Sequence, residues 1–91
     1  MKFEKSTRKN KKYMVTTPSG KIVHFGAIRN GIPMEQYKDS TGLGLYSEYD
    51  HGDIKRRQNY RTRHKGILLK NGKPAYLDKE QPAFYSYFFL W

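Results

Sequence analysis

The sequence predicts a small α+β domain: a β-hairpin, one basic helix and an aromatic C-terminal segment, preceded by a flexible basic N-terminal arm. Three observations support this prediction. Strand-forming residues flank a Pro-Ser-Gly turn near residue 18, a basic segment lies between an acidic cap and a glycine, and six of the last ten residues are aromatic. With 91 residues, the chain has room for one domain and one small core.

Positive charge is concentrated in two segments of the chain. There are 18 Lys and Arg residues against 8 Asp and Glu residues, which gives a formal net charge of +10. Residues 1–12 and residues 51–66 each carry a net charge of +5. Because residues 1–12 contain one aromatic side chain, Phe3, and no periodic apolar face, we expect them to form a disordered arm. The folded domain is then predicted over residues 13–91.

Residues 13–25 predict the hairpin. Residues 13–17 and 21–25 are rich in β-branched and aromatic side chains, and Gly20 can adopt the positive φ that the turn between them requires. Strand alternation places Val23 and Phe25 on the same face, which we expect to be buried. The following residues, 26–50, contain four glycines and scattered apolar side chains. We expect a long, partly ordered connection there, with a helical turn near Met34–Lys38, packed against another molecule.

The basic helix is predicted over residues 53–65. Asp50 or Asp53 can cap its start, and Gly66 can end it. Its sizeable apolar side chains are Ile54 and Tyr60, so the buried stripe is narrow. Most of its basic side chains are therefore expected to meet water or an anion.

The aromatic C-terminal segment predicts a second short helix that begins at Pro82. On such a helix Phe84, Phe88 and Trp91 share one face, and an exposed patch of that size would promote aggregation. We therefore expect a core made mainly of Val23, Phe25, Tyr60, Phe84, Phe88 and Trp91.

The sequence contains no recognisable catalytic or metal-binding pattern. His51, Asp53 and His64 lack the spacing of paired metal ligands, and eight carboxylates in the whole chain are few for a metallonuclease. Helix capping by an aspartate and buried hydrogen bonds of His24 and His64 explain these residues better. We expect no enzyme activity, no cofactor, no metal and no small-molecule substrate.

Three blocks of the sequence resemble one family of viral proteins. They are residues 21–26 (KIVHFG), residues 46–64 with a Tyr-x-x-Arg-His ending, and residues 84–91 (FYSYFFLW). The blocks are similar to an uncharacterised family of short basic proteins from large double-stranded DNA viruses of algae and protists, with relatives in some tailed phages. The chain departs from the family by a longer stretch between Gly26 and Tyr46, and by ending at a Leu-Trp pair that family members usually extend by a few residues.

The resemblance implies a viral origin and suggests a minor capsid or virion component, present in host cytoplasm or nucleus during assembly. We expect the basic arm and helix to bind acidic surfaces of larger viral structural proteins. The residues expected to carry this binding are Lys5, Arg8, Lys9, Lys11, Lys12, Lys55, Arg56, Arg57, Arg61 and Arg63.

Non-specific nucleic-acid binding is the alternative interpretation. A basic arm together with a basic helix also matches the electrostatic footprint of such proteins, and Tyr60 or the terminal aromatic side chains could stack on bases. The sequence has no recognisable helix-turn-helix, zinc-finger or RNA-recognition motif. It also lacks cysteine and any apolar run near the roughly 20 residues of a membrane span, so we expect neither disulfides nor a membrane span.

Overall fold

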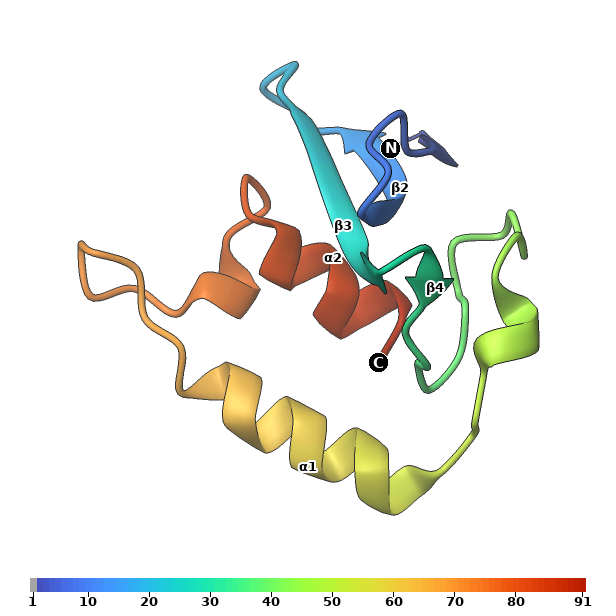
Figure 1. Ribbon diagram of the computed structural model, residues 1–91. Helices are drawn as coiled ribbons and strands as arrows, with labels where there is room; N and C mark the ends of the chain where they lie inside the picture. The colour runs from blue at the N-terminus through green and yellow to red at the C-terminus, as the bar shows by residue number, and fades with distance from the viewer. Residues whose placement is uncertain (1) are drawn as a thin grey trace.

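The computed structural model describes residues 2–91 and confirms the small α+β domain. A four-stranded antiparallel sheet has the order β1-β2-β3-β4, and its strands are β1 (Phe3–Lys5), β2 (Lys11–Thr16), β3 (Ile22–Arg29) and β4 (Ile32–Pro33). The helices are η1 (Ser47–Tyr49), α1 (Ile54–Lys65), η2 (Ala75–Leu77) and α2 (Pro82–Phe89). α2 lies between the sheet and α1, which gives three layers (Figure 1).

The predicted hairpin is present and is longer than expected. β2 and β3 pair so that Tyr13 lies opposite Phe25 and Val15 lies opposite Val23, and all four side chains are buried. Gly20, in the turn between the strands, has a φ of +88°. This conformation is accessible to glycine at little cost, so the turn residue and the strand pattern agree.

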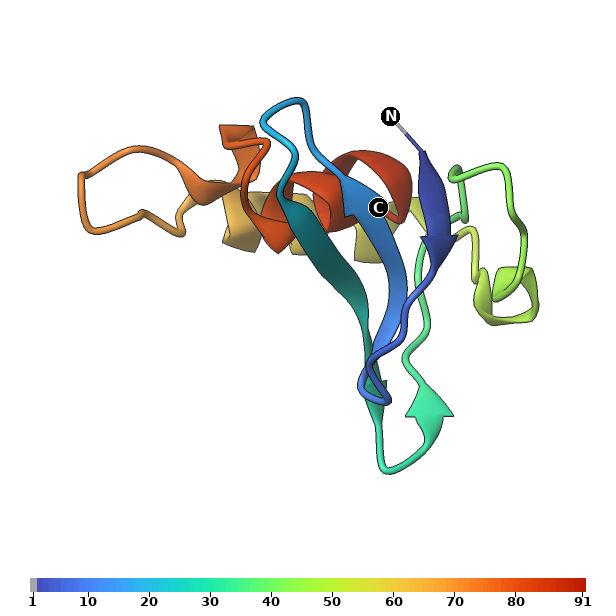
Figure 2. The ribbon, with the colours of Figure 1, turned by 90° about the horizontal axis from the view of Figure 1, so that it is seen from above.

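The prediction of a disordered N-terminal arm is wrong. β1 pairs with β2, with Phe3 opposite Val15, and lies beside it along one edge of the sheet (Figure 2). The Phe3 ring packs against Phe89 at 4.7 Å and Phe25 at 5.9 Å between ring centroids. One aromatic side chain is enough to anchor this short strand because α2 provides an aromatic surface to receive it. The predicted boundary after residue 12 therefore falls inside β2.

The core lies between the sheet and α2. Its buried members are Tyr13, Val15, Val23, Phe25, Tyr85 and Leu90. The predictions for Val23 and Phe25 are confirmed, and Phe84 and Trp91 pack against this core while partly exposed. Phe88 is 44% exposed and was wrongly assigned to the core. Tyr85 and Phe89, rather than Phe88, face the sheet, where both rings contact Phe3.

The connection after the hairpin is ordered by the chain itself. The predicted helical turn near Met34–Lys38 is wrong: Gln36 forms a parallel bridge with Asp50. The backbone N–H groups of Tyr37 and Lys38 both donate to the Leu90 carbonyl at 3.0 Å. The connection therefore packs on the end of α2.

Candidate anion-binding site

α1 begins and ends where its local sequence indicates. The Asp53 carboxylate caps it by accepting the N–H groups of Lys55 at 2.9 Å and Arg56 at 3.2 Å. Gly66 follows its last residue. The prediction of helix 53–65 is confirmed with Asp53, rather than Asp50, as the cap.

Arg57 and Arg61 point from α1 into the molecule and are half-buried, and their role in partner binding stays a prediction. The Nε–H groups of Arg57 and Arg61 donate to the main-chain oxygen of Trp91 at 2.7 and 3.2 Å. Their guanidinium groups lie 4.7 Å from the ring centres of Tyr37 and Tyr87, respectively. These two side chains attach α1 to the C-terminal segment.

Lys12 is also internal. Its side chain is 2% exposed, and its ammonium donates to the Met34 carbonyl and, at 2.6 Å, to Gln36 Oε1. Burial lowers the pKa of Lys12 to about 8, while the charges of Asp39 and Asp50 oppose this shift. The expected role of Lys12 in partner binding is therefore wrong, because a partner would have to open the fold to reach it.

Around Lys12 lies a polar cluster that organises the connection. Gln36 Nε2 donates to Asp50 Oδ1 at 2.8 Å, and the same oxygen accepts the Asp39 N–H at 3.0 Å. The Tyr13 hydroxyl donates to the Asp39 carboxylate. Sequence reasoning missed Gln36 and Asp39. The position of Lys12, next to Tyr13 and the apolar residues that follow it in β2, could have predicted a buried polar cluster.

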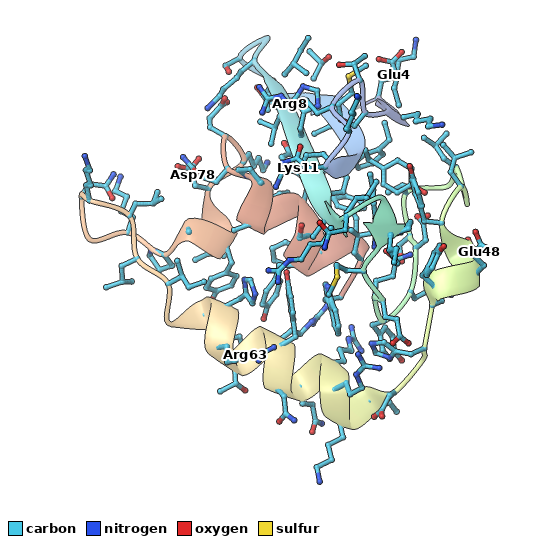
Figure 3. All side chains as sticks on the ribbon, in the orientation of Figure 1. Glu4, Arg8, Lys11, Glu48, Arg63 and Asp78 are labelled. Carbon is cyan, nitrogen blue, oxygen red and sulfur yellow. The ribbon has the colours of Figure 1, made fainter. Side chains whose placement is uncertain are left out.

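The other predicted basic residues lie on the surface or at a cleft. Side chains exposed to solvent are Lys5, Arg8, Lys9, Lys55, Arg56 and Arg63. Arg8 lies beside the sheet and Arg63 on α1 (Figure 3). Within residues 2–91 the ion pairs are Arg56 with Glu35 at 3.6 Å and Lys2 with Glu4 at 3.5 Å. Most of the surface cations therefore lack a carboxylate partner.

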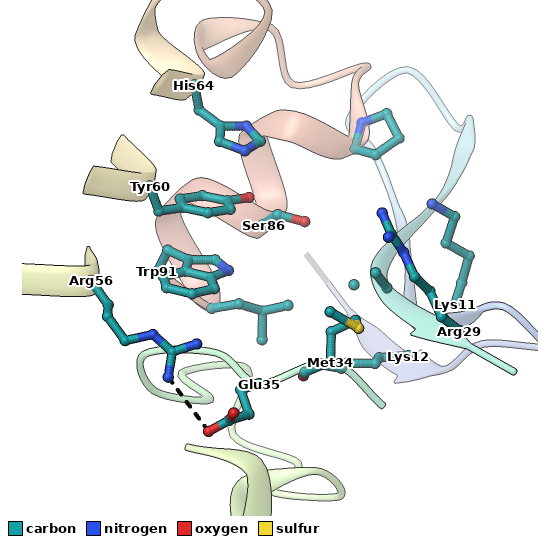
Figure 4. Close-up of a pocket in the computed structure, with 14 residues that line it drawn as sticks. Lys11, Lys12, Arg29, Met34, Glu35, Arg56, Tyr60, His64, Ser86 and Trp91 are labelled. Atoms are coloured by element: carbon teal, nitrogen blue, oxygen red, sulfur yellow. Dashed lines mark hydrogen bonds and ion pairs between the residues drawn. The ribbon is translucent and has the colours of Figure 1, made fainter. Parts of the chain in front are cut away.

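A cleft of about 460 Å³ opens between α1, α2 and the β3–β4 hairpin (Figure 4). Lys11 and Arg29 line it from the sheet, and Arg56, Tyr60 and His64 line it from α1. Basic groups from elements distant in sequence thus meet at one cleft.

One wall of the cleft is a row of stacked rings. Tyr60 lies between His64, at 3.8 Å and 19°, and Trp91, at 4.2 Å and 6°. Burial raises the pKa of Tyr60 to about 12, and the nearby Ser86 hydroxyl and Arg63 charge oppose this shift. Tyr60, predicted as core, is thus half-buried and stacks on the Trp91 indole.

Two of the three histidines form hydrogen bonds within the fold. His24 Nδ1 lies 2.7 Å from Ser6 Oγ, which confirms its predicted hydrogen bond, and His51 Nδ1 accepts the Asp53 N–H at 2.9 Å. His64 Nδ1 is buried without a hydrogen-bond partner among the described residues, contrary to its prediction. Burial, first among the causes, lowers the pKa of all three. Between residues 2 and 91, no three His, Cys, Asp or Glu side chains gather as metal ligands.

Comparison with known proteins identifies a partial family match. Residues 1–30, which contain β1, β2 and β3, match a family of unknown function, DUF5754. No curated protein and no solved structure matches the chain. Over the part of the chain that the structure describes, no helix is both long and apolar enough to cross a membrane.

Proposed function

We propose that the protein is a non-enzymatic structural protein, a minor component of a virus particle, that binds acidic surfaces of larger structural proteins. The observation that carries this proposal is a basic surface without carboxylate partners that also exposes large apolar side chains. The viral setting is supported by the resemblance of the three sequence blocks described above.

The charge argument follows from where the cations lie. Lys12, Arg57 and Arg61 are held inside the fold, and Lys21 donates to the Glu80 carbonyl at 3.2 Å. The remaining basic side chains give the surface a strong positive field, because the eight carboxylates of the chain are too few to balance its 18 cations. A field of this sign attracts and orients an anionic partner.

Exposed apolar side chains favour a protein as that partner. Ile54, next to Lys55 at the start of α1, is 61% exposed, and Ile22 is 55% exposed. Ile22 lines a groove together with Arg8 and Lys21. Protein interfaces combine apolar contacts with arginine, whereas nucleic-acid interfaces are more polar.

Virus particles purified from infected cells that produce this protein would test the proposal, by measuring whether the protein is part of them. We expect it to remain in particles at moderate salt and to be released at high salt. In binding assays with the major particle protein, the double variant Arg8→Glu/Lys9→Glu should weaken association. The matched variant Lys70→Glu, on the turn after α1, should not. Absence from particles, or equal binding by both variants, would contradict the proposal.

Non-specific nucleic-acid binding remains the second candidate, because the same charge would attract phosphates. A titration of labelled duplex DNA from low to above-physiological salt separates the two candidates. Every polycation binds DNA at low salt, so retention at physiological salt decides. Sub-micromolar affinity under that condition would favour the genome as the partner, and loss of binding would favour an acidic protein.

A further inference from the structure

We infer that the cleft between α1, α2 and the β3–β4 hairpin binds a nucleotide, with its phosphate beside Lys11 and Arg29. A free nucleoside monophosphate and one nucleotide of a single strand share this chemistry. The groove of Arg8, Lys21 and Ile22 that was proposed above to meet an acidic protein is a different surface from this cleft, so either proposal can fail alone.

The cations of the cleft are available to a ligand. Within residues 2–91, the side chains of Lys11 and Arg29 have neither an ion pair nor a hydrogen bond. The one carboxylate that lines the cleft belongs to Glu35, 3.6 Å from Arg56. The Glu35 and Arg56 side chains are 58% and 48% exposed, so their pair is weak. The pair lies across the cleft from Lys11 and Arg29 (Figure 4), where the Glu35 carboxylate repels an anionic ligand.

The aromatic row adds neutral donors to these charges. The Tyr60 hydroxyl, the Ser86 hydroxyl and the Trp91 indole nitrogen are directed toward the space between the aromatic row and the side chains of Lys11 and Arg29 (Figure 4). Ring stacking on both faces of Tyr60 holds the wall in one arrangement. A ligand therefore meets donors that are already positioned, which lowers the entropy cost of binding.

Size and lining indicate a ligand larger than a simple oxyanion. The volume of about 460 Å³ lies in the usual range of small-molecule sites. Met34, Ala27 and Leu90 contribute apolar surface beside the charged groups. The side chains of Tyr60, His64 and Trp91 line the cleft, so a base would lie against the edges of their rings. A phosphate joined to a planar ring satisfies all of these features, whereas an acidic peptide side chain provides no ring.

Trp91 is the only tryptophan of the chain and lines the cleft, so its fluorescence reports occupancy directly. We would titrate the full chain with AMP, adenosine, inorganic phosphate, a 5′-phosphorylated oligothymidylate and a glutamate-rich peptide, and confirm the affinities by calorimetry. AMP should bind at least about tenfold tighter than adenosine or phosphate. Tighter binding of AMP than of the oligonucleotide identifies a free nucleotide as the ligand, and the reverse order identifies a single strand.

Two exposed side chains allow the site to be changed without disturbing the core. Arg29→Gln should weaken AMP binding by about tenfold, and Glu35→Gln should strengthen it because the repelling carboxylate is removed. Lys70→Gln, a cation outside the cleft, should leave affinity unchanged. The inference is overturned if AMP and adenosine bind equally, if Arg29→Gln has no effect, or if the peptide displaces AMP at lower concentration. Arg8→Glu/Lys9→Glu, used above for protein binding, should leave AMP affinity within about twofold.

Discussion

The Nε–H group of Arg57 donates to the main-chain oxygen of Trp91 at 2.7 Å, which joins the middle of α1 to the end of the aromatic segment. α1 has no fully buried residue, so it has little apolar area with which to hold itself on the fold. Charged side chains pointing inward provide much of that attachment.

Replacing Arg57 with Gln should therefore reduce stability. The expected loss in free energy of unfolding is about 1–2 kcal/mol, because a charge-assisted hydrogen bond and a cation–π contact disappear. Urea unfolding followed by circular dichroism measures this change. Arg63→Gln, an exposed change in the same helix, should stay within about 0.5 kcal/mol. Equal effects of the two variants would contradict the inward role of Arg57.

Gly26→Ala should destabilise the sheet strongly. Gly26 has a φ of +82°, and an added Cβ would lie 2.9 Å from Lys12 Cβ. Backbone strain and this contact together should cost about 2–3 kcal/mol. Gly20→Ala is the matched control, because Gly20 has a φ of +88° and open space around it. Gly20→Ala should lower the free energy of unfolding by about 1 kcal/mol, measured by thermal or urea unfolding. If Gly26→Ala and Gly20→Ala lose the same amount, the contact with Lys12 adds nothing.

The two faces of α2 should respond differently to truncation. Tyr85 is fully buried and its hydroxyl donates to the Lys79 carbonyl at 2.8 Å, so Tyr85→Ala should cost about 3–5 kcal/mol. Phe88 is 44% exposed, and Phe88→Ala should cost about 1 kcal/mol or less. Urea denaturation midpoints of the two variants give the comparison. A larger loss for Phe88→Ala would reverse the assignment of the buried face.

Acid should destabilise the protein as pH falls below about 6.5. The folded state lowers the pKa of His51, mainly by burial and also by the charge of Arg56, so the unfolded chain binds a proton first. Protonation also removes the Nδ1 acceptor that receives the Asp53 N–H, next to the cap of α1. The urea concentration at the midpoint of unfolding should decrease as the pH is lowered from about 7 to about 5. His51→Asn, which cannot titrate, should show a smaller fall, and an unchanged fall would exclude His51 as a cause.

Lys12 should make stability depend on pH in the alkaline range. Its pKa is lowered from 10.5 to about 8, so between these values the unfolded state binds more protons and stability rises with pH. Tyr13 opposes this trend at higher pH, because burial raises its pKa and the folded state keeps that proton longer. The stability difference between the natural protein and Lys12→Met isolates the lysine. That difference should shift by on the order of 1 kcal/mol in favour of the natural protein between about pH 7.5 and pH 9.5.

The features that the sequence predicts well depend on neighbouring residues. Gly20 in the hairpin turn, Asp53 at the start of α1 and Pro82 at the start of α2 each act within a few residues, and each is confirmed. The inward direction of Arg57 depends instead on Trp91, and no local pattern predicts it.

The remaining differences also arise from contacts between distant segments. Phe3 becomes a strand anchor because Phe89 receives its ring, and Lys12 becomes buried because Gln36 supplies an acceptor. The cleft is likewise formed by side chains from separate elements, so its cations were predicted singly or missed, as Arg29 was. A basic residue in a short chain is therefore assigned to the surface by default, and only the fold shows which ones are internal.

The packing of Phe3 on Phe89 has a consequence for synthesis on the ribosome. The first strand gains its contacts with α2 only after residues 82–91 have been made, and the same segment holds α1 through Trp91. Until those residues leave the exit tunnel, the apolar face of β2 and β3 has no cover. The nascent chain is thus expected to complete this domain only when residues 82–91 are free to pack, and to depend on chaperones until then.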